Sequence, residues 1–259
     1  MSGSAVGGSV MERVVRIVEA FGPDSPVLGV SELSRMTGLH VATVSRYADG
    51  LVTAGWLERD EQRRLRAGVR LWEVASRASA VSGLRGAAMP FMEDLSAVHR
   101  HHVQLGVLKG HDVLFVERLG SAPAVAPVNE VAGRLPLHAS SAGLVLLAFA
   151  PVSLQDEVLS GPLHAFTGRT ITDPAQLRRV LAQVRSTGHA TCAGHLVTGA
   201  CSVAVPVRDR SGAVVAAMSL IMPDDGSAHL CVPGLRAACL GIGRSLGVPD
   251  PRRERAASA

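Results

Sequence analysis

Hydroxyl and guanidinium groups gather on one side of a predicted helix near the N-terminus. In TGLHVATVSRYADGLVTAGWLERD, residues 37–60, apolar side chains recur at helical spacing at positions 41, 44, 48, 51 and 52. The polar face that remains carries Thr43, Ser45, Arg46 and Asp49. Hydroxyl and guanidinium groups pair with phosphates and with base edges. The pattern favours a nucleic-acid contact, and the alternative is a solvated face of an ordinary helical domain.

The elements around this helix predict a winged helix-turn-helix. We expect a helix over residues 10–21 and a shorter one from Ser31, its N-cap, to Met36, ended by Gly38 in a left-handed conformation. The helix with the polar face follows, and then WLERD and RRLRAG form two short strands around a charged turn. In such a module the third helix enters the major groove of DNA. The predicted wing supplies cations beside the backbone: Arg59, Arg63, Arg64 and Arg66.

The remainder of the chain alternates between strand and helix patterns. Residues 69–92 are expected to be helical, with a domain boundary around residues 79–86 and Pro90 in the first turn of the next helix. Two hairpins are predicted, turning at residues 109–112 and 210–212. AGLVLLAFA predicts a buried helix, DPAQLRRVLAQVRSTG an amphipathic one with Asp173 as its N-cap, and VPGLRAACLGIGRSLG a C-terminal one. The expected fold class is α/β (α+β).

Composition limits the class of protein. The 259 residues are 47% apolar and 3% aromatic, with a formal charge of +4, which permits an anionic partner without proving one. The four cysteines form no C-x-x-C pair, and the chain has no signal-like N-terminus and no apolar run of about 18 residues. We therefore expect a cytoplasmic protein with reduced thiols and no membrane contact.

Two other chemistries have weaker support. His99, His101 and His102, with His111 nearby, suggest a metal, but no carboxylate or cysteine lies at a ligand spacing. We interpret them as a surface or edge-strand cluster, and we predict no metal and no cofactor.

Catalysis is the alternative function. Ser141 lies in A-S-S-A-G close to His138, which suggests a hydrolase-like enzyme with an accessory helical domain. The segment begins a helix without a preceding core strand, however, and no Asp-then-His order downstream of it is compelling. No phosphate-binding loop is present in the sequence. We therefore expect a protein that is not an enzyme.

Three segments, taken in order, resemble one family. They are SELSRMTGLHVATVSRYADGLVTAGWLERD, GRLPLHASSAG and GACSVAVPVRDRSGAVVAAMSL, which begin at residues 31, 133 and 199. The chain resembles the isocitrate-lyase-regulator (IclR) family of bacterial transcription factors. The resemblance implies a winged helix (residues 9–70), a linker helix (71–84), a GAF-like effector domain (85–248) and a basic, disordered tail (249–259). It also implies a homodimer or homotetramer that binds operator DNA, with an affinity altered by an organic acid or aromatic catabolite.

The resemblance carries DNA contacts over to particular positions. The family usually has Pro-Lys-Ser-Thr-Val-His-Arg where this chain has residues 40–46, HVATVSR. Thr43 and Arg46 match, whereas Val41 and Ala42 replace the Lys and Ser, so we expect different phosphate contacts and more reliance on the wing. The predicted DNA-binding residues are Thr43, Ser45, Arg46, Tyr47, Arg59, Arg63 and Arg64.

The effector site is carried over in the same way. The family's pocket is lined by the start of the HASSAG helix and by strands around residues 191–204. The predicted effector-binding residues are Ala126, Ser140, Ser141, Cys192, Ser202 and Ala204. A helix N-terminus at Ser140 and Ser141 can present N–H groups to a carboxylate, and the alternative is that these small residues only permit tight packing. Cys192 replaces a usual Asp, which predicts a less acidic pocket that tolerates an anion.

Overall fold

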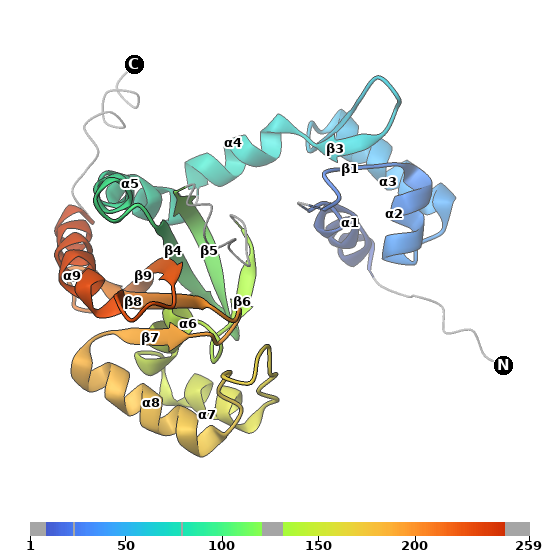
Figure 1. Ribbon diagram of the computed structural model, residues 1–259. Coiled ribbons are helices and arrows are strands. Elements are labelled where there is room, and N and C mark those ends of the chain that lie inside the picture. Colours follow the sequence, from blue (N-terminus) through green and yellow to red (C-terminus); the bar gives the residue numbers. More distant parts are fainter. Residues whose placement is uncertain (1–8, 23, 79, 121–131, 247–259) are drawn as a thin grey trace. The chain divides into compact units, whose positions relative to one another are not determined.

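The computed structural model describes four stretches of the chain: residues 9–22, 24–78, 80–120 and 132–246. They form two compact units that divide between Ser82 and Gly83 (Figure 1). The predicted effector residue Ala126 and the predicted tail lie outside the described residues. In the described ranges, no helix is both long enough and apolar enough to cross a membrane.

The first unit is a small helical domain with a three-stranded sheet. Its elements are α1 (Val10–Glu19), β1 (Val27–Leu28), α2 (Val30–Thr37), α3 (Val41–Thr53), β2 (Leu57–Arg59), β3 (Leu65–Ala67) and α4 (Val69–Ala78). The strands pair antiparallel in the order β1-β3-β2. Helices and sheet bury one cluster: Ile17, Leu28, Leu33, Leu39, Val44, Ala48, Leu57 and Leu65. The predicted order of a winged helix-turn-helix is confirmed.

Local signals predicted most of this unit well, but they missed the N-cap of α2 and the strand β1. Gly38 ends α2 with a φ of 69°, as expected. The N-cap of α2 is Gly29 rather than Ser31, because the Glu32 carboxylate accepts the Gly29 N–H at 2.7 Å. The segment GPDSPVLG was predicted only as a break between helices, but it contains β1. Its prolines and glycines favour no regular structure locally, and pairing with β3 makes the segment extended.

The start of α4 is fixed to the wing. Glu58 on β2 accepts the Val69 N–H at 3.0 Å through one carboxylate oxygen and pairs with Arg66 at 3.0 Å through the other. The hydrogen bonds from Val69 and Arg66 lower the pKa of Glu58. A Cβ at Gly68 would lie 2.4 Å from the carbonyl oxygen of Gly55, so glycine is required at this junction. The direction in which α4 leaves the wing is therefore set by several contacts at once.

The second unit is an antiparallel sheet in the order β6-β5-β4-β9-β8-β7, with helices on both faces (Figure 1). Its strands are β4 (His102–Lys109), β5 (Asp112–Leu119), β6 (Arg134–Pro136), β7 (Ala190–Ala193), β8 (Ala200–Arg208) and β9 (Val214–Pro223). Its helices are α5 (Ala80–His99), α6 (Ser141–Ala148), α7 (Val152–Ser160), α8 (Pro174–Thr187) and α9 (Ala228–Ser245). α5 and α9 cover one face of the sheet, and α6, with α7 and α8 outside it, covers the other.

Several predictions for this unit are confirmed. The hairpins turn where expected, with Lys109 paired to Asp112 and Arg208 to Val214. Every residue of α6 is buried, as its apolar sequence indicated. Asp173 caps α8 by accepting backbone N–H groups from the first turn of the helix. The predicted α/β (α+β) fold class is confirmed.

Two helix starts were predicted wrongly, because tertiary packing overrides proline as a boundary signal. Pro90 lies in the interior of α5, where a buried stripe continues through it along Leu84, Ala88, Met92 and Leu95. α9 begins at Ala228, ahead of the predicted start, and Pro233 lies within it.

The interpretation of the histidines as a surface or edge-strand cluster is wrong for His102. This residue is buried on β4, which pairs with both β5 and β9 and is therefore a central strand. Its Nδ1 lies 3.0 Å from the carbonyl oxygen of Gly120, so a hydrogen bond offsets the burial of the ring.

Two glycine substitutions should change stability in opposite directions. Gly68→Ala should lower the free energy of unfolding by roughly 1–3 kcal/mol, because its methyl group overlaps the Gly55 carbonyl. Gly50→Ala, in α3 with nothing within 4 Å of the new methyl, should raise it by about 0.5–1 kcal/mol. Denaturant unfolding of both variants checks this, and equal effects of the two substitutions would contradict it.

Candidate nucleic-acid interface and ligand cavity

Arg46 and Tyr47 form a hydrogen-bonded pair on α3. Arg46 is exposed on the face opposite the buried apolar side chains of the helix. Its Nη2 donates to the Tyr47 hydroxyl at 3.3 Å, and its guanidinium carbon lies 5.0 Å from the ring centroid. The hydrogen bond from Arg46 lowers the pKa of the Tyr47 hydroxyl. The other two predicted contacts on α3, Thr43 and Ser45, are half-buried at the edge of this face.

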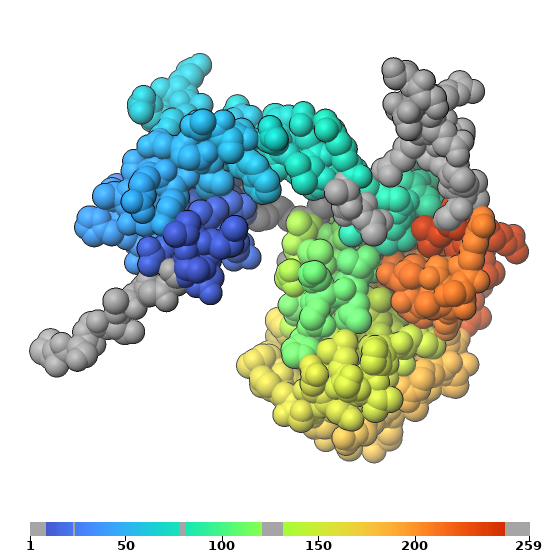
Figure 2. Space-filling view, turned by 180° about the vertical axis from the view of Figure 1, so that it is seen from behind, coloured from blue at the N-terminus to red at the C-terminus, as the bar shows by residue number. Residues whose placement is uncertain are grey.

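The wing, which comprises β2, β3 and the turn between them, projects from the first unit (Figures 1 and 2). Arg59 pairs with Asp49 of α3 at 2.6 Å, and Arg64 pairs with Asp60 at 2.9 Å. Arg63 lies in the turn with a φ of 60° and has no acidic partner among the described residues. Exposed ion pairs contribute little to stability. Exchanging these carboxylates for phosphates would therefore cost the domain little.

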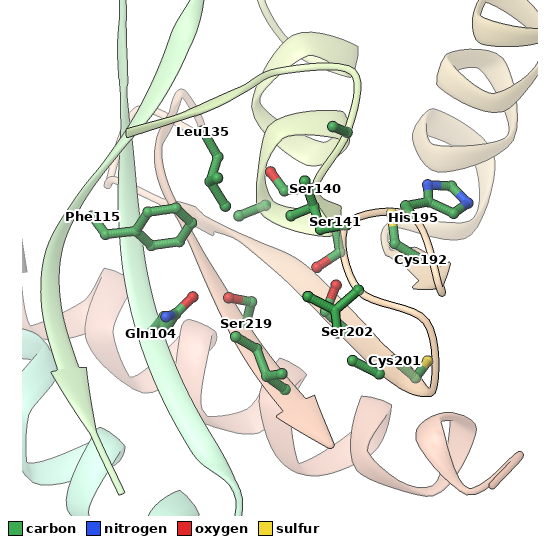
Figure 3. A pocket seen from close by; sticks show the side chains of 16 residues that line it. Gln104, Phe115, Leu135, Ser140, Ser141, Cys192, His195, Cys201, Ser202 and Ser219 are labelled. Carbon is green, nitrogen blue, oxygen red and sulfur yellow. The ribbon is translucent and has the colours of Figure 1, made fainter. Parts of the chain in front are cut away.

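The second unit contains a cavity between the start of α6 and the sheet (Figure 3). About 520 Å³ of space, part of it open to solvent, lies between the lining residues. Its lining residues are Gln104, Phe115, Leu135, Ala139, Ser140, Ser141, Ala142, Cys192, His195, Leu196, Val197, Ala200, Cys201, Ser202, Ser219 and Ile221.

Four of the predicted effector residues meet in this cavity, and one does not. Ser140 and Ser141 come from the start of α6, and Cys192 and Ser202 face each other across β7 and β8. Ala204, two residues further along β8, belongs instead to the hydrophobic core around α6.

The first turn of α6 lies at the cavity and has backbone N–H groups without an acceptor among the described residues. The Ser140 side chain caps the helix by accepting the Gly143 N–H at 3.1 Å. In the described part of the chain, the backbone N–H groups of Ser141 and Ala142 have no acceptor. A Cβ at Gly143 would lie 2.4 Å from the Leu137 carbonyl oxygen, so glycine allows the helix to approach this closely. The arrangement suits a carboxylate oxygen.

Two polar residues that the sequence analysis missed form the opposite wall. Gln104 and Ser219 are paired across β4 and β9, and they are 1% and 2% exposed. Both lie on strands whose other residues are mostly apolar. A polar residue in such a strand was the signal in the sequence that could have identified them as lining residues. The ring of Phe115 completes the wall and lies beside Gly106, its partner on β4. A Cβ at Gly106 would lie 2.5 Å from a methyl group of Val113 and 3.5 Å from the Phe115 ring, so glycine is needed at this position.

The loop between β7 and β8, residues 194–199, closes the cavity and is held by hydrogen bonds from two threonine side chains. Thr167 Oγ1 donates to the Gly194 carbonyl at 2.6 Å, and Thr170 Oγ1 donates to the His195 carbonyl at 2.6 Å. The Nδ1 of His195 is buried and has no hydrogen-bond partner within the described residues. Burial, with the nearby Arg169 guanidinium, lowers the pKa of His195, so its ring stays neutral. The cavity therefore has no charged lining side chain among the described residues.

Comparison with known proteins covers both units. Residues 10–61 match the IclR helix-turn-helix domain, and residues 77–226, more than half of the chain, match the C-terminal domain of bacterial transcriptional regulator IclR. The chain belongs to the IclR family. It is a DNA-binding transcriptional regulator.

Similar IclR-family proteins extend over nearly the whole chain. An IclR homologue from Microbacterium hydrocarbonoxydans, solved as a complex with 4-hydroxybenzoate, is 42% identical. Its TM-score is 0.89 over 92% of this chain and 99% of that chain. A homologue from Microbacterium sp. strain HM58-2 is 39% identical, with a TM-score of 0.62 over 94% and 100%. The glycerol operon regulatory protein of Streptomyces griseus is 29% identical over 92% of this chain and 96% of its own length.

The alternative of a hydrolase has no support from its two residues. His138 Nε2 lies 3.0 Å from the carbonyl oxygen of His164, so this nitrogen carries a proton and cannot accept one from a serine. Ser141 makes no hydrogen bond with His138 in the described part of the chain. The related IclR-family proteins are transcriptional regulators, which are not enzymes.

The four cysteines of this IclR-family protein are free, buried thiols. Burial raises the pKa of Cys192, Cys201 and Cys239, to about 11 for Cys201 and about 12 for Cys239. Burial also raises the pKa of Cys231. A raised pKa keeps a thiol protonated, and the thiolate is the reactive form.

Native protein should therefore react slowly with a thiol reagent at about pH 8. Denatured protein should release four equivalents, one for each cysteine. The absorbance of the chromogenic thiol that the reagent releases measures the reaction of the native and of the denatured protein. Ser211→Cys, in the exposed β8–β9 turn, provides a control that should react fast in the native protein. Rapid stoichiometric labelling of native wild-type protein would show that the thiols are accessible.

Proposed function

We propose that the cavity at the start of α6 is the effector site and that α3 and the wing together bind the operator. The observation that carries the first part is the buried helix N-terminus, whose unpaired N–H groups face an otherwise uncharged cavity. The exposed guanidinium groups of Arg46 and Arg63 support the second part. Effector and operator sites then lie in different units of the chain.

The proposed effector is a small aromatic monocarboxylate. Its carboxylate would accept N–H groups from Ser141 and Ala142, where the helix dipole favours negative charge. Its ring would pack against Phe115 and Leu135, and a polar group at the far end would reach Gln104. The 4-hydroxybenzoate bound to the 42%-identical Microbacterium protein supports this class. A molecule with several negative charges would find no cationic side chain among the described lining residues.

Regulation would follow from linkage between the two sites. An effector that prefers one arrangement of the DNA-binding units shifts operator affinity, typically by about 5- to 150-fold. The arrangement proposed is a homodimer or homotetramer acting in the cytoplasm, with two recognition helices reading two half-sites and α4 as part of the linker. The proposal requires no cofactor.

The operator proposal predicts different effects for the two exposed arginines. Arg46→Ala should cost roughly 1–3 kcal/mol on the operator and relax sequence preference, because the guanidinium would read a base edge. Arg63→Ala should weaken binding on every sequence and reduce the salt dependence, because it would contact phosphate. Mobility-shift titrations on operator and scrambled DNA at several salt concentrations separate the two. Arg178→Ala, on the exposed surface of α8, is the matched control, and unchanged affinity for Arg46→Ala would exclude α3 as the reader.

The effector proposal predicts selectivity for a carboxylate. Calorimetric titration should show binding of 4-hydroxybenzoate and at least about tenfold weaker binding of 4-hydroxybenzamide, which lacks the charge. Ser202→Leu should abolish binding by filling the cavity, whereas Ser186→Leu on exposed α8 should leave it unchanged. Equal affinity for the acid and the amide would contradict a role for the α6 N-terminus.

A further inference from the structure

A second cleft in the effector unit is lined by four arginines. It lies where β8 and α9 end, beside the residue that follows α8, and contains about 1350 Å³ of space open to solvent. We name it the arginine cleft, after Arg208, Arg210, Arg236 and Arg244. It shares no lining residue with the cavity at α6 within the described part of the chain. It is therefore a separate site from the one proposed for the aromatic effector.

Three of the guanidinium groups are held in place by backbone carbonyls. Arg208 Nη1 donates to the Gly212 carbonyl at 2.8 Å, and its guanidinium carbon lies 4.5 Å from the centroid of the Phe149 ring. Arg210 Nη2 donates to the Arg244 carbonyl at 3.4 Å, and Arg236 Nη2 donates to the carbonyl of Thr187. A guanidinium has five N–H groups, so each of these arginines keeps most of its donors. Anchoring reduces the entropy that a ligand would otherwise lose by ordering these side chains.

The positive charge of the cleft is not neutralised by neighbouring carboxylates. None of the four arginines forms an ion pair with a described residue. Asp209 is the acidic residue in the lining, and it accepts the N–H groups of Ser211 and Ala213 at 2.9 and 3.1 Å. Hydrogen bonds from Ser211 lower the pKa of Asp209, so it stays ionised and holds the β8–β9 turn. Four cations against one anion leave an excess of three positive charges.

Capping of helix ends explains only part of this arrangement. The carbonyl groups that Arg236 and Arg210 contact belong to the last turns of α8 and α9, where a cation is favourable. Arg208 lies over the ring of Phe149, the C-cap residue of α6, and Arg244 lies in the last turn of α9. Neither side chain donates a hydrogen bond to a helix-end carbonyl among the described residues, so capping hydrogen bonds do not account for these two arginines.

We propose that the arginine cleft binds a small oxyanion with two or more negative charges, such as a phosphate group or a polycarboxylate. Guanidinium groups form paired hydrogen bonds with the oxygens of both groups. The uncharged cavity at α6 suits one carboxylate on an aromatic ring, whereas this cleft suits concentrated negative charge. The regulator would then take two chemically distinct ligands in one unit.

The test is calorimetric titration of the full-length protein with inorganic phosphate and with citrate, at constant ionic strength. Wild-type protein should bind at least one of them, and the one preferred identifies a phosphoryl or a polycarboxylate site. Arg208→Gln and Arg244→Gln should each weaken that binding by at least about tenfold, through loss of a charge-assisted hydrogen-bond pair. Arg244→Gln keeps the test valid if Arg208→Gln does not fold, because no described contact depends on the Arg244 side chain.

Arg179→Gln on exposed α8 removes the same charge outside the cleft and should leave anion binding unchanged. Binding of 4-hydroxybenzoate should also be unchanged in both cleft variants. Absence of phosphate and citrate binding by wild-type protein would overturn the proposal. Equal weakening of anion binding by Arg179→Gln would also overturn it, because the effect would then come from non-specific charge. Unchanged anion binding with reduced DNA affinity in the cleft variants would overturn it as well, and would assign the arginines to DNA.

Discussion

The approach of α6 to the segment before it is the constraint on which the second unit depends. Gly143 lies against the Leu137 backbone at a distance that excludes any side chain, and this contact sets where the helix begins. Because the helix is buried throughout, its first N–H groups cannot reach bulk solvent easily and end at the cavity instead. Unpaired buried donors are costly, so the unit is built in a way that an anionic ligand would stabilise.

The DNA-binding unit follows a different principle, in which exposed charges are paired but weakly held. Three arginines of the wing pair with Asp49, Asp60 and Glu58, and ion pairs at a protein surface contribute little to stability, so exchanging these partners for phosphates would cost little. At the start of α3, Val41 and Ala42 are exposed where the family usually has a cation and a hydroxyl. The chain thus concentrates its charged groups at Arg46 and in the wing.

Most features fixed by neighbouring residues could be predicted from the sequence, apart from the N-cap of α2, and features fixed by distant residues could not. The left-handed Gly38, the two hairpin turns and the cap at Asp173 are local, and all were predicted correctly. β1 and the helical path through Pro90 depend on partners far along the chain. Of the cavity, Ser140, Ser141, Cys192 and Ser202 followed from the resemblance. Gln104 and Ser219 did not, because only strand pairing brings them to the same wall.

The junction at Gly68 has a mechanical consequence. The first N–H of α4 is bonded to Glu58 on the wing, and the preceding glycine lies against the Gly55 backbone, so a bend at this point would break several contacts together. A rotation of α4 would therefore carry the wing with it. Such a junction transmits an angle without reshaping α3, so the face of α3 that meets DNA can stay constant while its direction changes.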